Sequence, residues 1–240
     1  MTLIAENIKK VYNKRAIVND ISVEFNSNEV VGILGPNGAG KSTLFSILAG
    51  IIKPDYGSII LDGHNITKVK IHKRAKLGLT YLPQDTSIFQ GLNVEDNIKA
   101  ILEIAYDNQT QITLKLNELL AKLSLEHIRK STATQLSGGE RRKVEIARAL
   151  ALSPKFIFLD EPFAGVDPIS IKDIISVIHD MRNSGIGVII TDHNVRDTLQ
   201  NIDRGYIISD GRILYSGSGL EIATDKNVNN VYLGDSFHEF

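Results

Sequence analysis

A stretch of eight residues has the composition and spacing of a phosphate-binding loop. Residues 35–42 fit the pattern G-x-x-x-x-G-K-S/T, after an apolar strand and before a helical run from Thr43 to Ala49. The glycines let backbone N–H groups point inward at an anion, and the helix N-terminus adds positive potential. Lys41 would then reach the β- and γ-phosphates of a nucleotide, and Ser42 would offer its hydroxyl to Mg²⁺. We predict nucleotide contacts at Gly35, Pro36, Asn37, Gly38, Ala39, Gly40, Lys41, Ser42 and Thr43.

Two adjacent carboxylates, Asp160 and Glu161, directly follow the apolar run Phe156 to Leu159. If this run is a buried parallel strand, the carboxylates lie at its C-terminal end, where α/β sheets bind ligands. Asp160 is expected to help hold Mg²⁺ through its water shell, and Glu161 to polarise the water that attacks the γ-phosphate. A strand followed by an acidic turn is common, so this interpretation depends on the phosphate loop in the same chain.

A second glycine-containing segment, Leu136 to Glu140, precedes another predicted helix, Arg141 to Leu152. The free N–H groups at a helix start suit an anion, and small residues let it come close. Taken alone, the segment would be read as a capped helix start. Together with the first loop, it makes Ser137, Gly138 and Gly139 a second candidate phosphate cradle.

Composition restricts the classes of function. The chain has 240 residues, and its 27 basic and 28 acidic residues nearly cancel, so we predict no nucleic-acid partner. The absence of cysteine excludes disulfides, thiolate metal sites and a cysteine nucleophile, which suits a reducing cytoplasm. Charged residues at Glu6, Lys9 and Lys10 argue against a signal peptide, and no apolar run approaches the roughly 20 residues that span a bilayer. At a membrane, partners would have to supply the spanning part.

The elements that must position these residues are strands alternating with helices. Short apolar runs at Glu29 to Leu34, Phe156 to Leu159 and Gly187 to Thr191 predict a parallel sheet covered on both faces. Between Asn93 and Leu152 the apolar residues follow a helical period, with a helix start at Asn93. We therefore predict one domain over 1–240, with a core formed by 1–84 and 153–240 and an inserted helical subdomain at 85–152.

The chain resembles the ATPases of ABC transporters in the order of three segments: the phosphate loop, the Leu136 to Glu140 segment and the carboxylate pair. The resemblance extends over nearly the whole chain. The resemblance implies an α/β fold: a P-loop NTPase (RecA-like) core with an ABC-type antiparallel β subdomain and an inserted α-helical subdomain. It also implies ATP and Mg²⁺ as cofactors. The chain is then expected to form an ATP-sandwich homodimer, in which the Ser137 segment of one subunit covers the nucleotide of the other.

Four further residues match family positions. Tyr12 would stack on adenine, with a packed strand tyrosine as the alternative. Gln84 would approach Mg²⁺ and link the core to the helical subdomain, unless it is an exposed loop amide. Asp167 lies in the loop that contacts the partner, but its neighbours depart from the commoner Ser-Ala-Leu-Asp form. His193 matches the histidine that touches the γ-phosphate and is, with Glu161, a predicted catalytic residue.

Five stretches are most similar to the ATPases of lipopolysaccharide export: 72–89, 136–150, 159–170, 190–199 and 231–237. That resemblance implies membrane subunits of the LptF and LptG kind with an LptC-like component, a place on the cytoplasmic face of the inner membrane, and no direct contact with cargo. ATPases of branched-chain amino acid importers share related loops and are the alternative with the same chemistry. A soluble ABC assembly ATPase without a permease, as in iron–sulfur cluster assembly, is the alternative of another class.

Two surface interpretations remain open. Ile88, Phe89 and Leu92 would form a groove for a short helix of a membrane subunit, or else belong to the core. The basic run Lys68, Lys70, Lys73, Arg74 and Lys76 is more often a solvated face than a contact for anionic headgroups or a partner.

Overall fold

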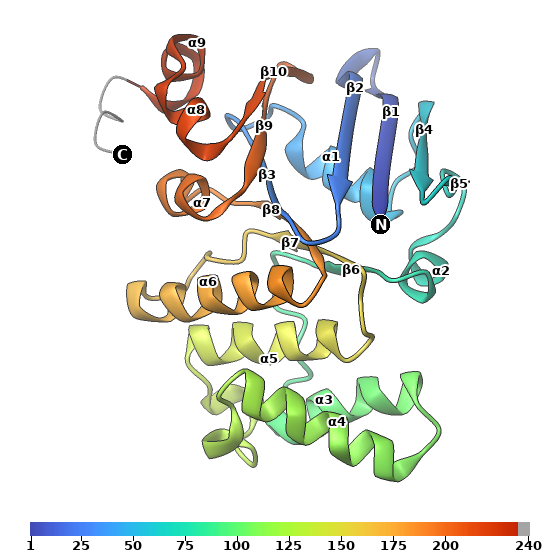
Figure 1. The fold of residues 1–240 in the computed structure, drawn as a ribbon, viewed down its shortest axis with the longest axis vertical. Coiled ribbons are helices and arrows are strands. Elements are labelled where there is room, and N and C mark those ends of the chain that lie inside the picture. The colour runs from blue at the N-terminus through green and yellow to red at the C-terminus, as the bar shows by residue number, and fades with distance from the viewer. Residues whose placement is uncertain (235–240) are drawn as a thin grey trace.

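The computed structural model describes residues 1–234, so the last part of the 231–237 stretch lies outside the described residues. An antiparallel sheet with the strand order β2-β1-β4-β5 is formed near the N-terminus (Figure 1). Its strands are β1 Thr2–Tyr12, β2 Arg15–Asn26, β4 Tyr56–Leu61 and β5 His64–Asn65. The tight turn between the last two has Asp62 and Gly63 at positive φ, 45° and 78°, which these residue types tolerate.

The second sheet has the order β10-β9-β3-β8-β7-β6. Its strands are β3 Val30–Leu34, β6 Leu79–Leu82, β7 Phe156–Asp160, β8 Gly187–Thr191, β9 Arg204–Ser209 and β10 Arg212–Gly217. All neighbouring pairs are parallel except β9 and β10. The predicted parallel sheet is therefore present, with one antiparallel strand at its edge.

Helices cover both faces of this sheet and form a separate layer below it (Figure 1). They are α1 Lys41–Ala49, α2 Ile71–Lys76, α3 Val94–Ala105, α4 Gln109–Lys122, α5 Gly138–Leu150, α6 Pro168–Asn183, α7 Val195–Asn201, α8 Gly219–Thr224 and α9 Lys226–Val228. The predicted helix start at Asn93 is present, because its side chain caps α3 by accepting from the Asp96 N–H. Helix α5 begins at Gly138, earlier than the predicted Arg141, because Ser137 caps it.

Alternation along β7 builds two cores on opposite faces of the sheet. Phe156 and Phe158 face α1 and the antiparallel sheet, and Phe158 packs edge-on against Phe45 of α1 at 5.8 Å between ring centroids. Ile157 and Leu159 face the other way, toward α5 and α6. The strand that ends at Asp160, directly before Glu161, is thus held from both sides.

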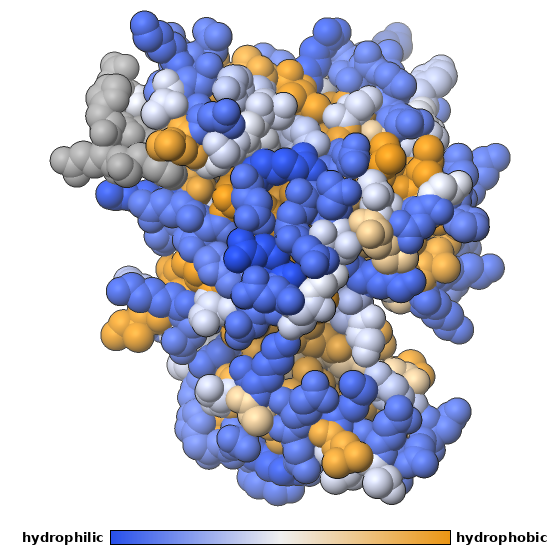
Figure 2. All heavy atoms as spheres, in the orientation of Figure 1, coloured by the Kyte–Doolittle hydropathy of each residue, from blue (hydrophilic) through white to orange (hydrophobic). Residues whose placement is uncertain are grey.

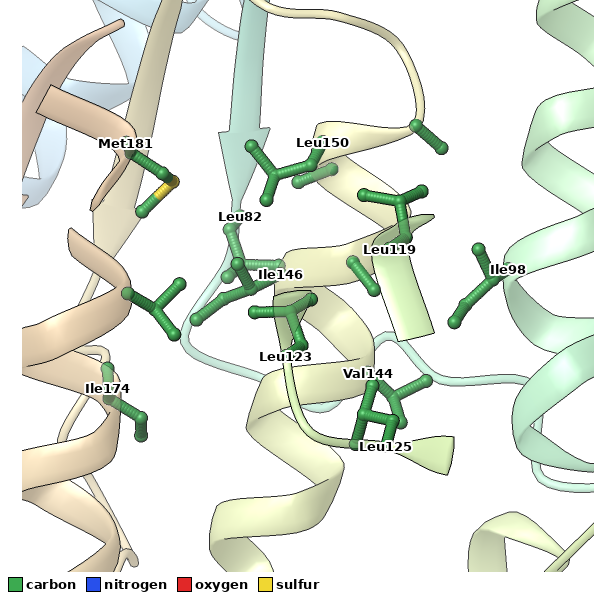
Figure 3. Close-up of a cluster of buried hydrophobic side chains, with 14 of the residues drawn as sticks. Leu82, Ile98, Leu119, Leu123, Leu125, Val144, Ile146, Leu150, Ile174 and Met181 are labelled. Carbon is green, nitrogen blue, oxygen red and sulfur yellow. The ribbon is translucent and has the colours of Figure 1, made fainter. Parts of the chain in front are cut away.

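The second core is continuous from the sheet into the helical layer. Figure 3 shows Leu82 of β6, Ile146 of α5 and Met181 of α6 facing one another, with Leu119 of α4 and Ile98 of α3 farther out. Because α5 takes part in this core, the N-terminus of α5 is positioned by the sheet as well as by the helical layer.

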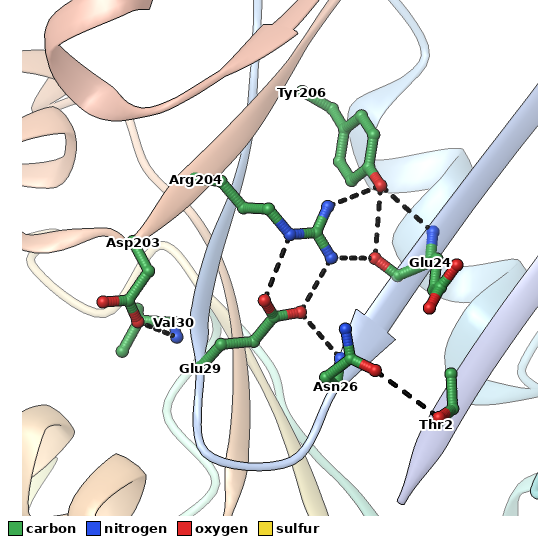
Figure 4. Close-up of polar contacts among 8 residues, drawn as sticks. All are labelled: Thr2, Glu24, Asn26, Glu29, Val30, Asp203, Arg204 and Tyr206. Atoms are coloured by element: carbon green, nitrogen blue, oxygen red, sulfur yellow. Dashed lines mark hydrogen bonds and ion pairs between the residues drawn. The ribbon is translucent and has the colours of Figure 1, made fainter.

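A polar network fixes the start of β3, the strand that carries the phosphate loop. Arg204 of β9 pairs with Glu29 through Nη2 and Oε1 at 2.7 Å and donates to the hydroxyl of Tyr206 and the carbonyl of Glu24 (Figure 4). The neighbouring Asp203 carboxylate accepts from the Val30 N–H at 2.8 Å. These bonds join the β2–β3 turn to β9.

Arg74 departs from the expected solvated basic face. It is only 1% exposed, and its guanidinium donates to the carbonyls of Ile47 and Leu48 in the last turn of α1 and of Ile66, Thr67 and Val69 before α2. Burial lowers the pKa of Arg74 to about 10, so it stays charged at neutral pH. The negative end of the α1 dipole favours a cation there. The neighbouring Lys68, Lys70, Lys73 and Lys76 are not buried.

The surface in the orientation of Figure 1 is mainly hydrophilic, with apolar residues in separated groups (Figure 2). Within residues 1–234, no helix is both long and apolar enough to cross a membrane.

An acid-sensitive ion pair supports α3. Glu95, in the first turn, accepts from Arg129 at 2.9 Å and pairs with Lys130 at 2.6 Å, and these bonds lower the pKa of Glu95 to about 2. Since its unfolded pKa is about 4.3, its stabilisation is complete above that pH and is lost as the pH falls toward 2. We expect Glu95→Gln to lower the free energy of unfolding by about 1–2 kcal/mol at pH 7, measured by urea denaturation.

The difference between wild type and Glu95→Gln should shrink below about pH 4.5. Glu103 is the matched control, because its 3.7 Å contact with Lys99 is half-exposed, and Glu103→Gln should change stability by less than about 0.5 kcal/mol. A Glu95→Gln effect equal to that of the control, or one that grows on acidification, would contradict the assignment.

Candidate nucleotide-binding site

The predicted phosphate loop joins β3 to α1, and its backbone takes conformations that favour glycine. Gly35, Gly38 and Gly40 have positive φ values of 148°, 78° and 105°. Gly40 is the N-cap of α1, and it makes no side-chain cap bond. The first N–H groups of α1 therefore remain available to an anion.

A cavity of about 430 Å³ opens over this loop. Its lining comes from four parts of the chain: the β2 residues Arg15 and Ile17, the loop and α1 residues 37–43, Glu161 after β7, and Thr191, Asp192 and His193 at the end of β8. The carboxyl ends of β3, β7 and β8 thus meet at one cavity, as expected for a parallel sheet.

Lys41 lies at the base of the cavity. Its side chain is buried, and its ammonium donates to the carbonyls of Gly35 at 2.7 Å and Pro36 at 3.0 Å. Burial lowers its pKa, and the nearby Glu161 and Asp160 carboxylates partly oppose that shift. The cation is therefore preplaced within the loop, and phosphate oxygens would be stronger acceptors than the two carbonyls it now contacts.

Glu161 contacts two other predicted site residues, Gln84 and His193. Its Oε2 accepts from Gln84 Nε2 at 2.5 Å, and its Oε1 is 2.9 Å from His193 Nε2. Its backbone has a φ of 46°, in the left-handed region that side chains rarely adopt, and its N–H donates to the Thr191 carbonyl. Residues held this way cluster at functional sites. His193 is 58% exposed, so its ring lies at the solvent side of the cavity.

Two buried carboxylates flank Glu161. Asp160 is 8% exposed, and it accepts from the Tyr81 hydroxyl at 2.9 Å. Asp192 is 4% exposed and accepts from the N–H groups of Phe163 and Asn194. Burial raises the pKa of both carboxyls because it disfavours the charged form.

The donor set fits a Mg²⁺ ion that arrives with a nucleotide. Ser42 is exposed on the cavity wall, Asp160 ends the adjacent strand, and Gln84 uses its amide nitrogen for Glu161, which leaves its oxygen as an acceptor. In residues 1–234 no group of three acidic or histidine side chains is arranged to hold a metal unaided. Mg²⁺ typically takes one or two protein ligands and completes its shell with phosphates and water.

The second glycine segment lies apart from the phosphate loop. Ser137 caps α5, and Gly138 lines a smaller cavity of about 180 Å³ together with Gln84 and Glu161. A Cβ on Gly138 would come within 2.7 Å of the Gly165 carbonyl, and one on Gly139 would overlap Ser170 of α6. These glycines therefore let α5 pack closely on α6 and on the loop before it, whatever ligand they bind.

The two remaining predicted residues take other positions. Asp167 caps α6 by accepting from the N–H groups of Ile169 and Ser170 at 3.1 and 3.0 Å. Tyr12 ends β1 outside the lining of the large cavity, 43% exposed and directly opposite Arg15, which does line it. Lys10 Nζ lies over its ring, 5.3 Å from the ring centroid.

Sequence reasoning missed several residues of the site. Arg15 and Ile17 belong to the lining, and Tyr81 and Arg142 hold Asp160 through its side chain and its carbonyl, at 2.9 Å each. Of these residues, only Arg15 could have been found from the sequence, because it follows the predicted adenine contact Tyr12 across a tight turn.

Two glycines of the loop should differ in how much stability their substitution by alanine costs. A Cβ at Gly35 would overlap the Ile208 carbonyl, whereas a Cβ at Gly38 would meet no atom of residues 1–234 within 4 Å. Both have positive φ, so each substitution costs about 1–2 kcal/mol of backbone strain. We expect Gly35→Ala to lower the free energy of unfolding by about 3 kcal/mol or more, and Gly38→Ala by about 1 kcal/mol, in urea titrations. Equal losses would show that the contact with Ile208 does not constrain the loop.

Comparison with known proteins places this geometry in a family. The model of the family described as ABC transporter matches residues 18–164. The chain is 52% identical over 237 residues, 98% of each chain, to the lipopolysaccharide export system ATP-binding protein LptB of Escherichia coli K12. It is 51% identical over 236 residues, again 98% of each chain, to LptB of Haemophilus influenzae.

Solved structures agree. An ATP-binding cassette of an ABC transporter in its ADP conformation has a TM-score of 0.87 at 29% identity, over 98% of this chain and 100% of that one. A nucleotide-free cassette from an ABC transporter has a TM-score of 0.88 at 28% identity with the same coverage. The predicted fold class, a P-loop NTPase core of the ABC type, is confirmed.

Proposed function

The chain belongs to the ABC transporter family and is an ATP-binding, ATP-hydrolysing subunit, and we propose that it powers extraction of lipopolysaccharide from the inner membrane. The observation that carries the chemical part is the convergence of Lys41, Glu161 and His193 on one cavity. The cargo is inferred from identity of about 50% to relatives named for lipopolysaccharide export, across nearly the whole chain.

ATP binding is assigned to the loop cavity. The N–H groups of residues 37–43 surround the phosphates, and Lys41 exchanges its two carbonyl partners for β- and γ-phosphate oxygens. Tyr12 offers the outer face on which adenine stacks. When bound, Mg²⁺ would be held by Ser42, Asp160 and Gln84 and would offset charge on the phosphates.

Hydrolysis is assigned to Glu161 and His193. Glu161 accepts a proton from the attacking water, and its carboxylate is already oriented by Gln84 and His193. His193, exposed at the cavity mouth, contacts the γ-phosphate. Of these two residues, Glu161 acts as the general base, so turnover depends on its negative charge.

A second copy of the chain completes the site in this proposal. Ser137 and Gly138 are exposed at the N-terminus of α5, where free N–H groups and the helix dipole favour a phosphate. A two-fold pair would place each Ser137 segment over the nucleotide of the partner, with Asp167 in the loop at the contact. Closure then depends on the γ-phosphate, because both subunits contact it.

Membrane subunits of the LptF and LptG kind, with an LptC-like component, are the proposed partners at the cytoplasmic face of the inner membrane. Phe89 and Leu92 support this because they are 46% and 36% exposed, while Ile88 is buried in the core. Arg148 of α5 lies 4.3 Å from the Phe89 ring centroid and keeps the ring in place. A short apolar helix that docks here would be connected to α5. No direct contact with cargo is proposed.

The alternatives lack comparable support. A branched-chain amino acid importer would use the same chemistry, and a soluble assembly ATPase would need no exposed aromatic beside α5. The relatives at about 50% identity whose names state a substrate are named for lipopolysaccharide export.

Depletion of the subunit in its own cells tests this proposal. We expect lipopolysaccharide to accumulate at the inner membrane, measured by fractionation and immunoblotting, with rescue by the wild-type gene and not by Glu161→Gln. Uptake of radiolabelled leucine is the control and should remain normal until growth stops. Loss of leucine uptake with normal lipopolysaccharide at the cell surface would contradict the cargo assignment.

A further inference from the structure

The residue that ends the glycine segment, Glu140, already occupies the hydrogen-bonding groups of Ser137. Its Oε2 accepts from the Ser137 N–H and from the Ser137 hydroxyl, both at 2.8 Å, and its own N–H donates to the Ser137 oxygen at 3.3 Å. This reciprocal arrangement is a capping box. A serine hydroxyl has one proton, so Ser137 has none left to donate to another acceptor.

The negative charge of Glu140 is well stabilised where it is. Its bonds to Ser137 lower its pKa, with smaller contributions from His127 and Lys143. His127 Nε2 lies 3.8 Å from the other carboxylate oxygen, and Lys143 is engaged with Asp173 at 3.1 Å. A full negative charge therefore stands beside the hydroxyl of Ser137 at neutral pH.

We propose that Glu140 is a positioning residue that opposes closure of the nucleotide-bound pair. This inference rests on the proposed function, in which Ser137 meets the γ-phosphate held by the partner. For that contact the hydroxyl must turn its proton from the carboxylate to the phosphate, and the carboxylate then repels the arriving anion. Unit charges a few ångströms apart at a protein surface interact by enough to shift an equilibrium several-fold.

Substitution of Glu140 by glutamine distinguishes the effect of the charge from the effect of the cap, because it removes the charge and keeps the capping bond. Its amide oxygen still accepts from Ser137, and glutamine serves in capping boxes as glutamate does. Loss of a negative charge near the N-terminus of α5 should slightly lower thermal stability. If Glu140 had only a structural role, Glu140→Gln would weaken closure of the pair, because the cap would be less stable. In the proposed role the same substitution strengthens closure. The two roles therefore predict changes of opposite sign in the ATP requirement.

The chain contains a matched control. Ser218 and Glu221 form the same capping box at α8, with distances of 2.7, 2.8 and 3.3 Å. Glu221→Gln removes an equivalent charge from an equivalent cap, in a segment to which no nucleotide role is assigned.

Both substitutions should be tested in the full chain carrying Glu161→Gln, so that ATP is not consumed. Sedimentation velocity gives the ATP concentration at which half of the protein is dimeric. Glu140→Gln should lower that concentration about three- to tenfold, and the effect should shrink at high salt because charges are screened. Glu221→Gln should leave it unchanged.

Three outcomes overturn the inference. Glu140→Gln that leaves the ATP requirement unchanged or raises it shows that the carboxylate does not oppose closure. An equal shift in Glu221→Gln shows a general effect of net charge. If the Glu161→Gln parent forms no dimer at any ATP concentration, the paired site itself is contradicted, and the role of Glu140 with it.

Discussion

Glu161→Gln should bind ATP normally yet hydrolyse it about 10²- to 10⁴-fold more slowly than the wild-type chain. This range is typical for loss of a general base. The amide keeps the size of the side chain and can still accept from Gln84, which now donates at 2.5 Å. It cannot take up a proton from water. The left-handed backbone of Glu161, with its φ of 46°, should persist because its N–H bond to Thr191 is unaffected.

Phosphate release under saturating ATP measures the turnover of Glu161→Gln, and a fluorescent ATP analogue measures its affinity. His193→Ala is the informative companion, because it removes the other partner of Glu161, 2.9 Å away, without removing the carboxylate. Its loss of turnover should be smaller than that of Glu161→Gln if the carboxylate is the base. Normal turnover by Glu161→Gln would assign the base to another group.

Lys41→Ala should weaken ATP binding itself, by roughly 100-fold in Kd. Charge-assisted hydrogen bonds to a buried cation are worth about 1.5–3 kcal/mol each, and a factor of 100 corresponds to about 2.7 kcal/mol. The side chain is buried and already placed in the loop by Gly35 and Pro36, so little ordering is needed on binding.

Equilibrium titration with ATP measures this change, and Lys115→Ala on α4 is the control. Lys115 is outside the lining of the cavity, pairs loosely with Glu118 at 3.8 Å and lies over the Tyr106 ring at 6.0 Å. A circular dichroism melt should show that Lys41→Ala remains folded. If Lys41→Ala bound ATP with unchanged affinity, Lys41 would not contact the phosphates, and the role assigned to the loop would be contradicted.

The phosphate loop and the strand ends could be predicted because local chemistry determines them. Glycines at positive φ, a lysine at the helix start and an apolar strand before it are all visible within residues 30–43. The same holds for the N-cap at Asn93 and for the strand from Phe156 to Leu159, whose continuous apolar run predicts burial on both faces.

Other features depend on contacts between distant segments, and the sequence carried little sign of them. Arg74 lies in a run of basic residues, yet two of the carbonyls that accept from it belong to α1, 26 and 27 positions earlier. Arg15 and Ile17 enter the cavity only because the antiparallel sheet packs over the loop. By contrast, the start of α5 at Gly138 is set by a local cap between Ser137 and Glu140, which the capped-start interpretation of residues 136–140 indicated and the predicted start at Arg141 missed.

The most direct measurement of the central claim is to tag this subunit, solubilise native membranes in mild detergent and identify what co-purifies by mass spectrometry. Lipopolysaccharide export predicts two membrane proteins with large periplasmic domains, present in stoichiometric amounts and bringing bound lipopolysaccharide. Permeases with a soluble amino acid-binding protein, or soluble partners alone, would contradict export while leaving the ATPase chemistry intact.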